Sequence, residues 1–213
     1  MRVRVKICGI TDPAGVDAAV ESGADAVGFV LADSPRRVGL ERALGLAAMV
    51  PPFVARVAVL RCPAAETIRG IAAALAPHWI QTETTPEVES AIASSGPLPG
   101  GAGLLRVVHD GDHLLASLPP GVRILLLEAP GRGGLGVTPD WGRAAILARR
   151  VRLVLAGGLT PENVAEAIRR VRPYGVDVAS GVESFPGFKD PARVARFVAA
   201  VRRAEADLEE ADA

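Results

Sequence analysis

The sequence predicts an α/β protein of the (β/α)8 TIM-barrel class, and three observations support that fold. Short apolar runs alternate with amphipathic stretches along the chain. Eight such runs can be counted, which is the number of strands in this barrel. The chain has 213 residues, which fits one barrel domain over 1–213. An open, doubly wound sheet is the alternative architecture.

The predicted strands are short, branched and mostly apolar on both faces. Parallel strands covered by helices have this composition. They are expected at residues 3–7, 26–30, 54–60, 79–81, 104–108, 124–127, 153–156 and 176–179. The strand at 79–81 is the least convincing of these, and the helix pattern at 112–118 is short and weak.

Proline marks the start of many predicted helices. A short polar turn, a proline and an amphipathic stretch follow one another at Pro13, Pro63, Pro86, Pro161 and Pro191. Proline suits the first helical position because its missing N–H would have no partner there, and a preceding Asp or Thr can accept from first-turn amides. Each of these prolines therefore predicts a helix start. Residues 202–213 are predicted to be a solvated helix end or tail.

Charge and composition restrict the classes of ligand. Lys and Arg number 24, Asp and Glu also number 24, and aromatic residues make up only 4% of the chain. Nucleic-acid binding favours a basic face or stacking aromatics, so we expect no nucleic-acid partner. An anionic ligand must instead be held by local donors, meaning single arginines and backbone amides.

The sequence also bears on location. No apolar signal region follows the first residues, and no apolar run is long enough to span a bilayer. The two cysteines are too few for a disulfide framework. We therefore expect a cytoplasmic protein without a membrane partner, either a monomer or a homodimer.

Two glycine-bearing turns predict a phosphate site. They follow the last two predicted strands and contain Gly157 and Gly158 in one, Ser180 and Gly181 in the other. In a barrel, the loops after the strands form the active face, and phosphate commonly binds at the loops after the last two strands. Backbone amides backed by a helix N-terminus make such a nest. We expect a small phosphorylated substrate there.

Cys8 and Arg36 follow the first two predicted strands and belong to the same rim. A thiol can act as a general base if a neighbouring cation or helix N-terminus lowers its pKa, although a small buried hydrophobe is the alternative role for Cys8. A guanidinium can grip a carboxylate with two parallel hydrogen bonds. Arg37 fits a solvated surface arginine better than Arg36 does.

Glu128 ends the predicted strand at 124–127. Desolvation there would raise its pKa and make it a proton donor, so we expect a general acid, with Asp110 as the alternative acid. His109 and His113 are four residues apart, but Gly111 between them favours a turn, and we expect no metal site. Cys62 is interpreted as a packing residue.

Several segments together resemble phosphoribosylanthranilate isomerase, a (β/α)8 enzyme family of tryptophan biosynthesis. They are "KICGIT", "GFVLADSPRRV", "DW", "LAGGLTPENV" and "GVDVASGVESFPGFKDP". The first and the last are the most specific, and the resemblance covers nearly the whole chain.

The resemblance implies an aldose-ketose isomerase, an intramolecular oxidoreductase without metal or redox cofactor. The reaction is an Amadori rearrangement of N-(5-phosphoribosyl)anthranilate to 1-(2-carboxyphenylamino)-1-deoxyribulose 5-phosphate. Cys8 matches the family's catalytic base, and Arg36 matches the arginine that holds the anthranilate carboxylate. The two glycine turns match the phosphate site.

The chain departs from the family pattern at three places. Glu128 stands where the family usually has Asp, and the added methylene shifts the carboxyl by about 1 Å unless the backbone adjusts. The usual QLHG after the fourth strand is "QTET" from Gln81, and a usual Thr is Leu135. Two alternatives follow: a non-catalytic paralogue that binds phosphorylated ligands, and a dual-substrate isomerase of the tryptophan and histidine pathways.

Overall fold

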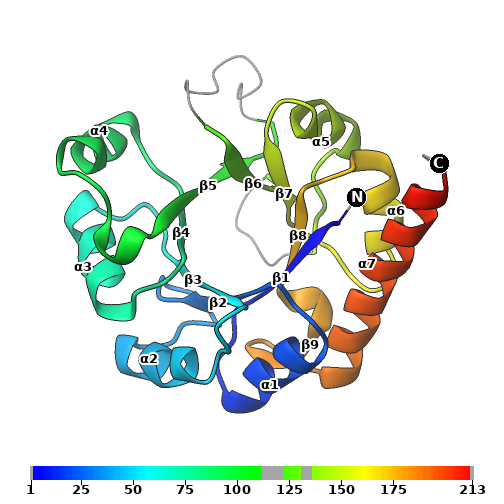
Figure 1. Ribbon diagram of the computed structural model, residues 1–213, viewed down its shortest axis with the longest axis horizontal. Helices are drawn as coiled ribbons and strands as arrows, with labels where there is room; N and C mark the ends of the chain where they lie inside the picture. The colour runs from blue at the N-terminus through cyan, green and yellow to red at the C-terminus, as the bar shows by residue number, and fades with distance from the viewer. Residues whose placement is uncertain (1, 112–121, 131–135, 212–213) are drawn as a thin grey trace.

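The residues that the structure describes, 2–111, 122–130 and 136–211, include eight parallel strands that close into a barrel (Figure 1). In this computed structural model each strand pairs with the next, and β1 also pairs with β8, which closes the ring. The predicted (β/α)8 barrel is confirmed, and the open sheet is wrong. The strands are β1 (Arg4–Cys8), β2 (Ala26–Val30), β3 (Ala55–Val59), β4 (Trp79–Thr82), β5 (Gly103–His109), β6 (Ile124–Glu128), β7 (Arg152–Leu155) and β8 (Gly175–Val178).

Helices cover the outside of the barrel (Figure 1). They are α1 (Pro13–Glu21), α2 (Leu40–Ala48), α3 (Ala65–Leu75), α4 (Pro86–Ser94), α5 (Trp141–Ala148), α6 (Val164–Val171) and α7 (Pro191–Ala211). Short 3-10 turns occupy Pro99–Gly101 (η1) and Ser180–Val182 (η3), and a small hairpin joins β9 (Glu183–Phe185) to β10 (Phe188–Lys189). The helix predicted at 112–118 lies outside the described residues. Within the described part of the chain, no helix has the length and apolarity that crossing a bilayer requires.

Three of the predicted helix starts are confirmed. Pro13, Pro86 and Pro191 are the first residues of α1, α4 and α7. The Asp12 side chain accepts from the Gly15 N–H, and Thr85 caps α4 in the same way. The local chemistry of these turns was therefore readable from the sequence.

Two predicted helix starts are wrong. α3 begins at Ala65, two residues after Pro63, because the residue between them is still extended. α6 begins at Val164, three residues after Pro161, because Asn163 Oδ1 accepts from the Thr160 N–H and holds an extra turn before the helix. In both places, the polar turn continues past the proline.

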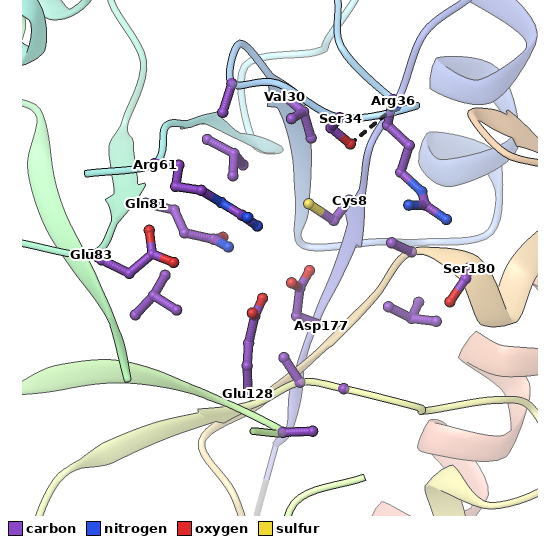
Figure 2. Close-up of a pocket in the computed structure, with 18 of the residues that line it drawn as sticks. Cys8, Val30, Ser34, Arg36, Arg61, Gln81, Glu83, Glu128, Asp177 and Ser180 are labelled. Atoms are coloured by element: carbon purple, nitrogen blue, oxygen red, sulfur yellow. Dashed lines mark hydrogen bonds between the residues drawn. The ribbon is translucent and has the colours of Figure 1, made fainter. Parts of the chain in front are cut away.

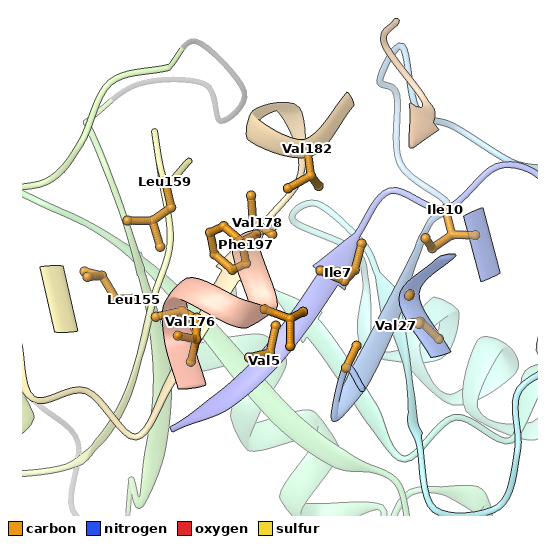
Figure 3. Packing of buried hydrophobic residues seen from close by; sticks show 14 of the residues in the cluster. Val5, Ile7, Ile10, Val27, Leu155, Leu159, Val176, Val178, Val182 and Phe197 are labelled. Atoms are coloured by element: carbon orange, nitrogen blue, oxygen red, sulfur yellow. The ribbon is translucent and has the colours of Figure 1, made fainter. Parts of the chain in front are cut away.

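Strand alternation separates the apolar core from the barrel interior. Val5 and Ile7 of β1 and Val176 and Val178 of β8 belong to the buried layer beneath α7, with Phe197 of that helix (Figure 3). Successive side chains of a strand point to opposite faces. The residues between these valines and isoleucines therefore face the barrel interior, which places polar side chains there.

The C-terminal end of α7 packs against the barrel. Ala204 and Leu208 are buried. Arg202 donates to the Val3 carbonyl and pairs with Asp25. Residues 202–211 are thus the predicted helix end, but they are solvated on one side only, because the other side of the helix stays in contact with the barrel up to its last turns. Residues 212–213 lie outside the described residues.

Candidate active site

A cavity at the carboxyl ends of the strands brings most of the predicted site residues together (Figure 2). Its lining includes the predicted Cys8, Arg36, Glu128, Gly157, Gly158 and Ser180. The same cavity is lined by Arg61, Gln81, Glu83 and Asp177, which the sequence analysis did not assign to the site. This end of a (β/α)8 barrel is where the active sites of this fold lie.

Cys8 is the last residue of β1, and its side chain lines the cavity while only 7% of the residue is exposed. Gly9 follows in the left-handed region, with φ at 75°, and its N–H donates to the Gly28 carbonyl of β2. Burial raises the pKa of the Cys8 thiol, while the neighbouring Lys6 cation acts to lower it. The thiol is thus the favoured form at neutral pH.

A buried ion pair lies directly beneath the thiol. Lys6 Nζ donates to Asp177 Oδ1 at 2.8 Å, and both side chains are almost fully buried. The two residues face each other because Lys6 of β1 pairs in register with Asp177 of β8. Burial acts to lower the pKa of Lys6, but Asp177 and Cys8 together raise it, so the lysine remains charged.

The sequence carried a signal for this pair that the analysis missed. Lys6 and Asp177 stand inside apolar strand segments, where a charged side chain is rarely buried unless it is paired. Each of these two side chains therefore requires a partner of opposite charge in the barrel interior. Which residues paired could be known only from the strand register.

Glu128 is the last residue of β6, and its carboxyl group enters the cavity from the side opposite Cys8, next to Asp177 (Figure 2). Burial raises the pKa of Glu128, and the negative charge of Asp177 raises it further. His109 acts in the other direction. A carboxyl group in this environment is a better proton donor than a solvated one.

Arg36 lies at the cavity but is already bound on one edge. Its Nε donates to Glu183 Oε1 at 2.8 Å and its Nη2 donates to Glu183 Oε2 at 2.7 Å. Glu183 also accepts from Lys189 Nζ at 2.7 Å. The pair of hydrogen bonds expected between Arg36 and a carboxylate is thus formed with Glu183. The edge of the guanidinium that does not face Glu183, called the end-on edge, is left for a ligand.

The two predicted phosphate turns are packed against neighbouring backbone. Gly157 and Gly158 have φ values of 87° and 58°, which favour glycine. A Cβ on Gly181 would lie 2.0 Å from the Leu159 carbonyl oxygen, so the turn after β8 touches the turn after β7. Ser180 lines the cavity, whereas Gly181 makes the backbone contact that holds the two turns together.

The end of β4 and the altered loop after it contribute polar groups. Gln81 is buried, and its Oε1 has no partner among the described residues. Glu83 lines the cavity, and its Oε1 lies 3.4 Å from His109 Nε2. A buried amide oxygen without a partner is costly, so a ligand hydroxyl group at that position would be bound favourably.

The alternative acid is engaged elsewhere. Asp110 accepts two hydrogen bonds from Arg143, at 2.7 and 2.6 Å, and a third from the Asp140 N–H. Arg143 holds the pKa of Asp110 below its usual range, so this carboxyl group is a poor proton donor. Asp110 instead holds residues at the start of α5, and it is not part of the cavity lining.

Cys62 and His78 lie apart from the predicted site. Cys62 is exposed, so its interpretation as a packing residue is wrong. His78 Nδ1 accepts from the Arg56 N–H and is outside the cavity lining. In the described ranges, no three His, Cys, Asp or Glu side chains gather as metal ligands would. His113 and Leu135 are outside the described residues.

Comparison with known proteins identifies relatives over nearly the full length. The family model of N-(5'-phosphoribosyl)anthranilate (PRA) isomerase matches residues 5–200. The N-(5'-phosphoribosyl)anthranilate isomerase of Haloferax volcanii is 39% identical, with 97% of this chain and 96% of that protein covered. That of Chromohalobacter salexigens is 45% identical, with coverages of 96% and 97%.

A solved structure shows the same relationship in three dimensions. A crystal structure of phosphoribosyl anthranilate isomerase in complex with reduced 1-(o-carboxyphenylamino)-1-deoxyribulose 5-phosphate superposes with a TM-score of 0.78. It is 35% identical in sequence, and the match covers 95% of this chain and 100% of that chain. The family model, the sequence relatives and this structure agree: the chain belongs to the N-(5'-phosphoribosyl)anthranilate isomerase family.

Proposed function

We propose that this chain catalyses the Amadori rearrangement of N-(5-phosphoribosyl)anthranilate in tryptophan biosynthesis, with Cys8 as general base and Glu128 as general acid. The observation that carries the assignment is a thiol and a carboxyl group on opposite sides of one cavity, beside the two glycine turns. The product is 1-(2-carboxyphenylamino)-1-deoxyribulose 5-phosphate.

Glu128 begins the reaction by protonating the ring oxygen of the ribose. The carbon–oxygen bond of the ring breaks, and the nitrogen lone pair forms a Schiff base. Burial and Asp177 raise the pKa of Glu128, so the carboxyl group holds a proton to higher pH than a solvated one. Positioned acids of this kind contribute about 100-fold to 10,000-fold to a rate.

Cys8 then removes the proton from C2 of the opened sugar, and the electron pair moves to give an enolamine that tautomerises to the ketone. The base must be a thiolate, although burial favours the thiol. Lys6 stabilises the thiolate because its positive charge lies beside the sulfur. Asp177 in turn keeps Lys6 charged and in place.

The remaining predicted residues bind the two anionic ends of the substrate. The turns at Gly157, Gly158, Ser180 and Gly181 are assigned the phosphate, because their packed backbone forms one wall of the cavity. Arg36 is assigned the ring carboxylate through the end-on edge that Glu183 leaves open. The protein is proposed to act in the cytoplasm as a monomer or homodimer.

Replacement of the sulfur tests the assignment. Cys8→Ser is expected to lose turnover, measured by the loss of anthranilate fluorescence, while binding of the reduced product analogue changes little. A serine variant with parental turnover would remove Cys8 from the mechanism. A parent protein that binds the analogue but never turns over the substrate would instead indicate the non-catalytic alternative.

Growth tests the substrate range. Expression in tryptophan and histidine auxotrophs is expected to rescue only the tryptophan requirement. Rescue of both would indicate the dual-substrate alternative.

A further inference from the structure

Arg61 presents a cation to the cavity that no residue described by the structure binds. It follows β3 after Leu60, and its side chain lines the cavity beside that of Gln81 (Figure 2). The two segments are adjacent because the Leu60 N–H donates to the Gln81 carbonyl. The described residues offer Arg61 neither a hydrogen bond nor an ion pair. A charged guanidinium is thus free to meet a ligand.

The other cations near the cavity are already paired. Lys6 is bonded to Asp177, and Glu183 takes both Lys189 and the side-on edge of Arg36. Their charges are therefore partly neutralised before a substrate arrives. The two hydrogen bonds to Glu183 also fix the position of the Arg36 guanidinium.

The loop that carries Arg61 has a strained backbone. Cys62, the next residue, has a φ of 40°, in the left-handed region that residues other than glycine rarely adopt. Strained backbone of this kind is often found at functional sites. Here the turn aims Arg61 into the cavity while Cys62 stays exposed.

Arg61 and the two phosphate turns therefore lie on opposite sides of the reacting groups, Cys8 and Glu128. In the ring order, β3 and β4 lie opposite β7 and β8, and Figure 2 shows Cys8 and Glu128 between Arg61 and Ser180. We propose that Arg61 binds the ring carboxylate of the substrate in addition to Arg36, and so adds to specificity for the anthranilate part. Arg36 offers that carboxylate only one edge, whereas Arg61 can offer a full two-bond contact.

The inference rests on the proposed function, and its test compares two ligands that differ only in the ring carboxylate. They are reduced 1-(o-carboxyphenylamino)-1-deoxyribulose 5-phosphate and reduced 1-phenylamino-1-deoxyribulose 5-phosphate. Dissociation constants are measured for the parent, for Arg61→Gln and for Arg37→Gln. Arg37 is a matched control because it is exposed, carries the same charge and is outside the cavity lining.

Arg61→Gln is expected to weaken binding of the carboxylated ligand by about tenfold to a hundredfold, the size of a lost charge-assisted hydrogen bond. Binding of the ligand without the carboxylate should change less than threefold, and Arg37→Gln should change neither. Arg61→Lys should recover part of the loss, because lysine keeps the charge but not the two-bond geometry.

Equal weakening of both ligands by Arg61→Gln, or no weakening of either, would overturn the assignment. Turnover in the parent is measured in the same samples. A parent that discriminates the two ligands through Arg61 but shows no turnover would contradict the proposed reaction and leave this contact standing. A parent with turnover and no effect of Arg61→Gln would contradict the contact alone.

Discussion

Gly181→Ala is the substitution whose effect can be worked most directly from the structure. A Cβ at this position would lie 2.0 Å from the Leu159 carbonyl oxygen, 3.0 Å from its carbon and 3.2 Å from Thr160 Cα. All three atoms are backbone, so no side chain can rotate away. Real Cβ contacts essentially never fall below 3.0 Å, so the turns after β7 and β8 must separate by about 1 Å.

That displacement sets the expected loss. A misplacement of about 1 Å in a positioning element costs roughly a hundredfold in rate, or about 2.7 kcal/mol. We expect kcat/KM to fall by about that factor, with weaker inhibition by inorganic phosphate, because both turns form the assigned phosphate site. The assay is the steady-state loss of anthranilate fluorescence, with inorganic phosphate as competitor.

Gly70→Ala is the matched control. It lies in α3 with no atom within 4 Å of the added Cβ, and its helical backbone favours alanine over glycine by about 1 kcal/mol. We expect unchanged kinetics and equal or higher thermal stability. The reasoning is refuted if folded Gly181→Ala, checked by circular dichroism, keeps kcat/KM and phosphate inhibition within threefold of the parent.

Two further predictions concern the charged groups of the cavity. Glu128→Gln should lower kcat about 100-fold to 10,000-fold. Its residual activity should keep rising above neutral pH in a pH–rate profile, because burial raises the pKa of the remaining Cys8 thiol; a fall from neutral pH upward would contradict this. Because the folded-state pKa of Glu128 is raised, its stabilising contribution is complete at acid pH and is lost as pH rises through that pKa. Urea unfolding of the variant and the parent measures this effect. The free energy of unfolding of Glu128→Gln minus that of the parent should be larger at neutral pH than at acid pH. Lys6→Met should lower the free energy of unfolding in urea by about 3–5 kcal/mol, because Asp177 is left buried and unpaired. Adding Asp177→Leu to Lys6→Met should restore most of that loss. No recovery in the double variant would argue against the ion pair as the cause.

The sequence by itself determined the alternation of strands and helices and much of the rim. Apolar strands such as the one at Ala26–Val30 were readable because burial on both faces leaves a local composition signal. The same holds for helix starts at Pro13 and Pro86, whose capping partners are neighbours in the chain. Cys8 and Glu128 reach one cavity because every parallel strand ends at the same face.

The tertiary structure decided which polar groups meet. Closure of the barrel puts Lys6 in register with Asp177, and the turn after β8 brings Glu183 onto Arg36, contacts between residues more than a hundred positions apart. Arg143 likewise takes Asp110 away from the reaction. Such pairings depend on register and on the packing of separate loops, and no local pattern of residues encodes them.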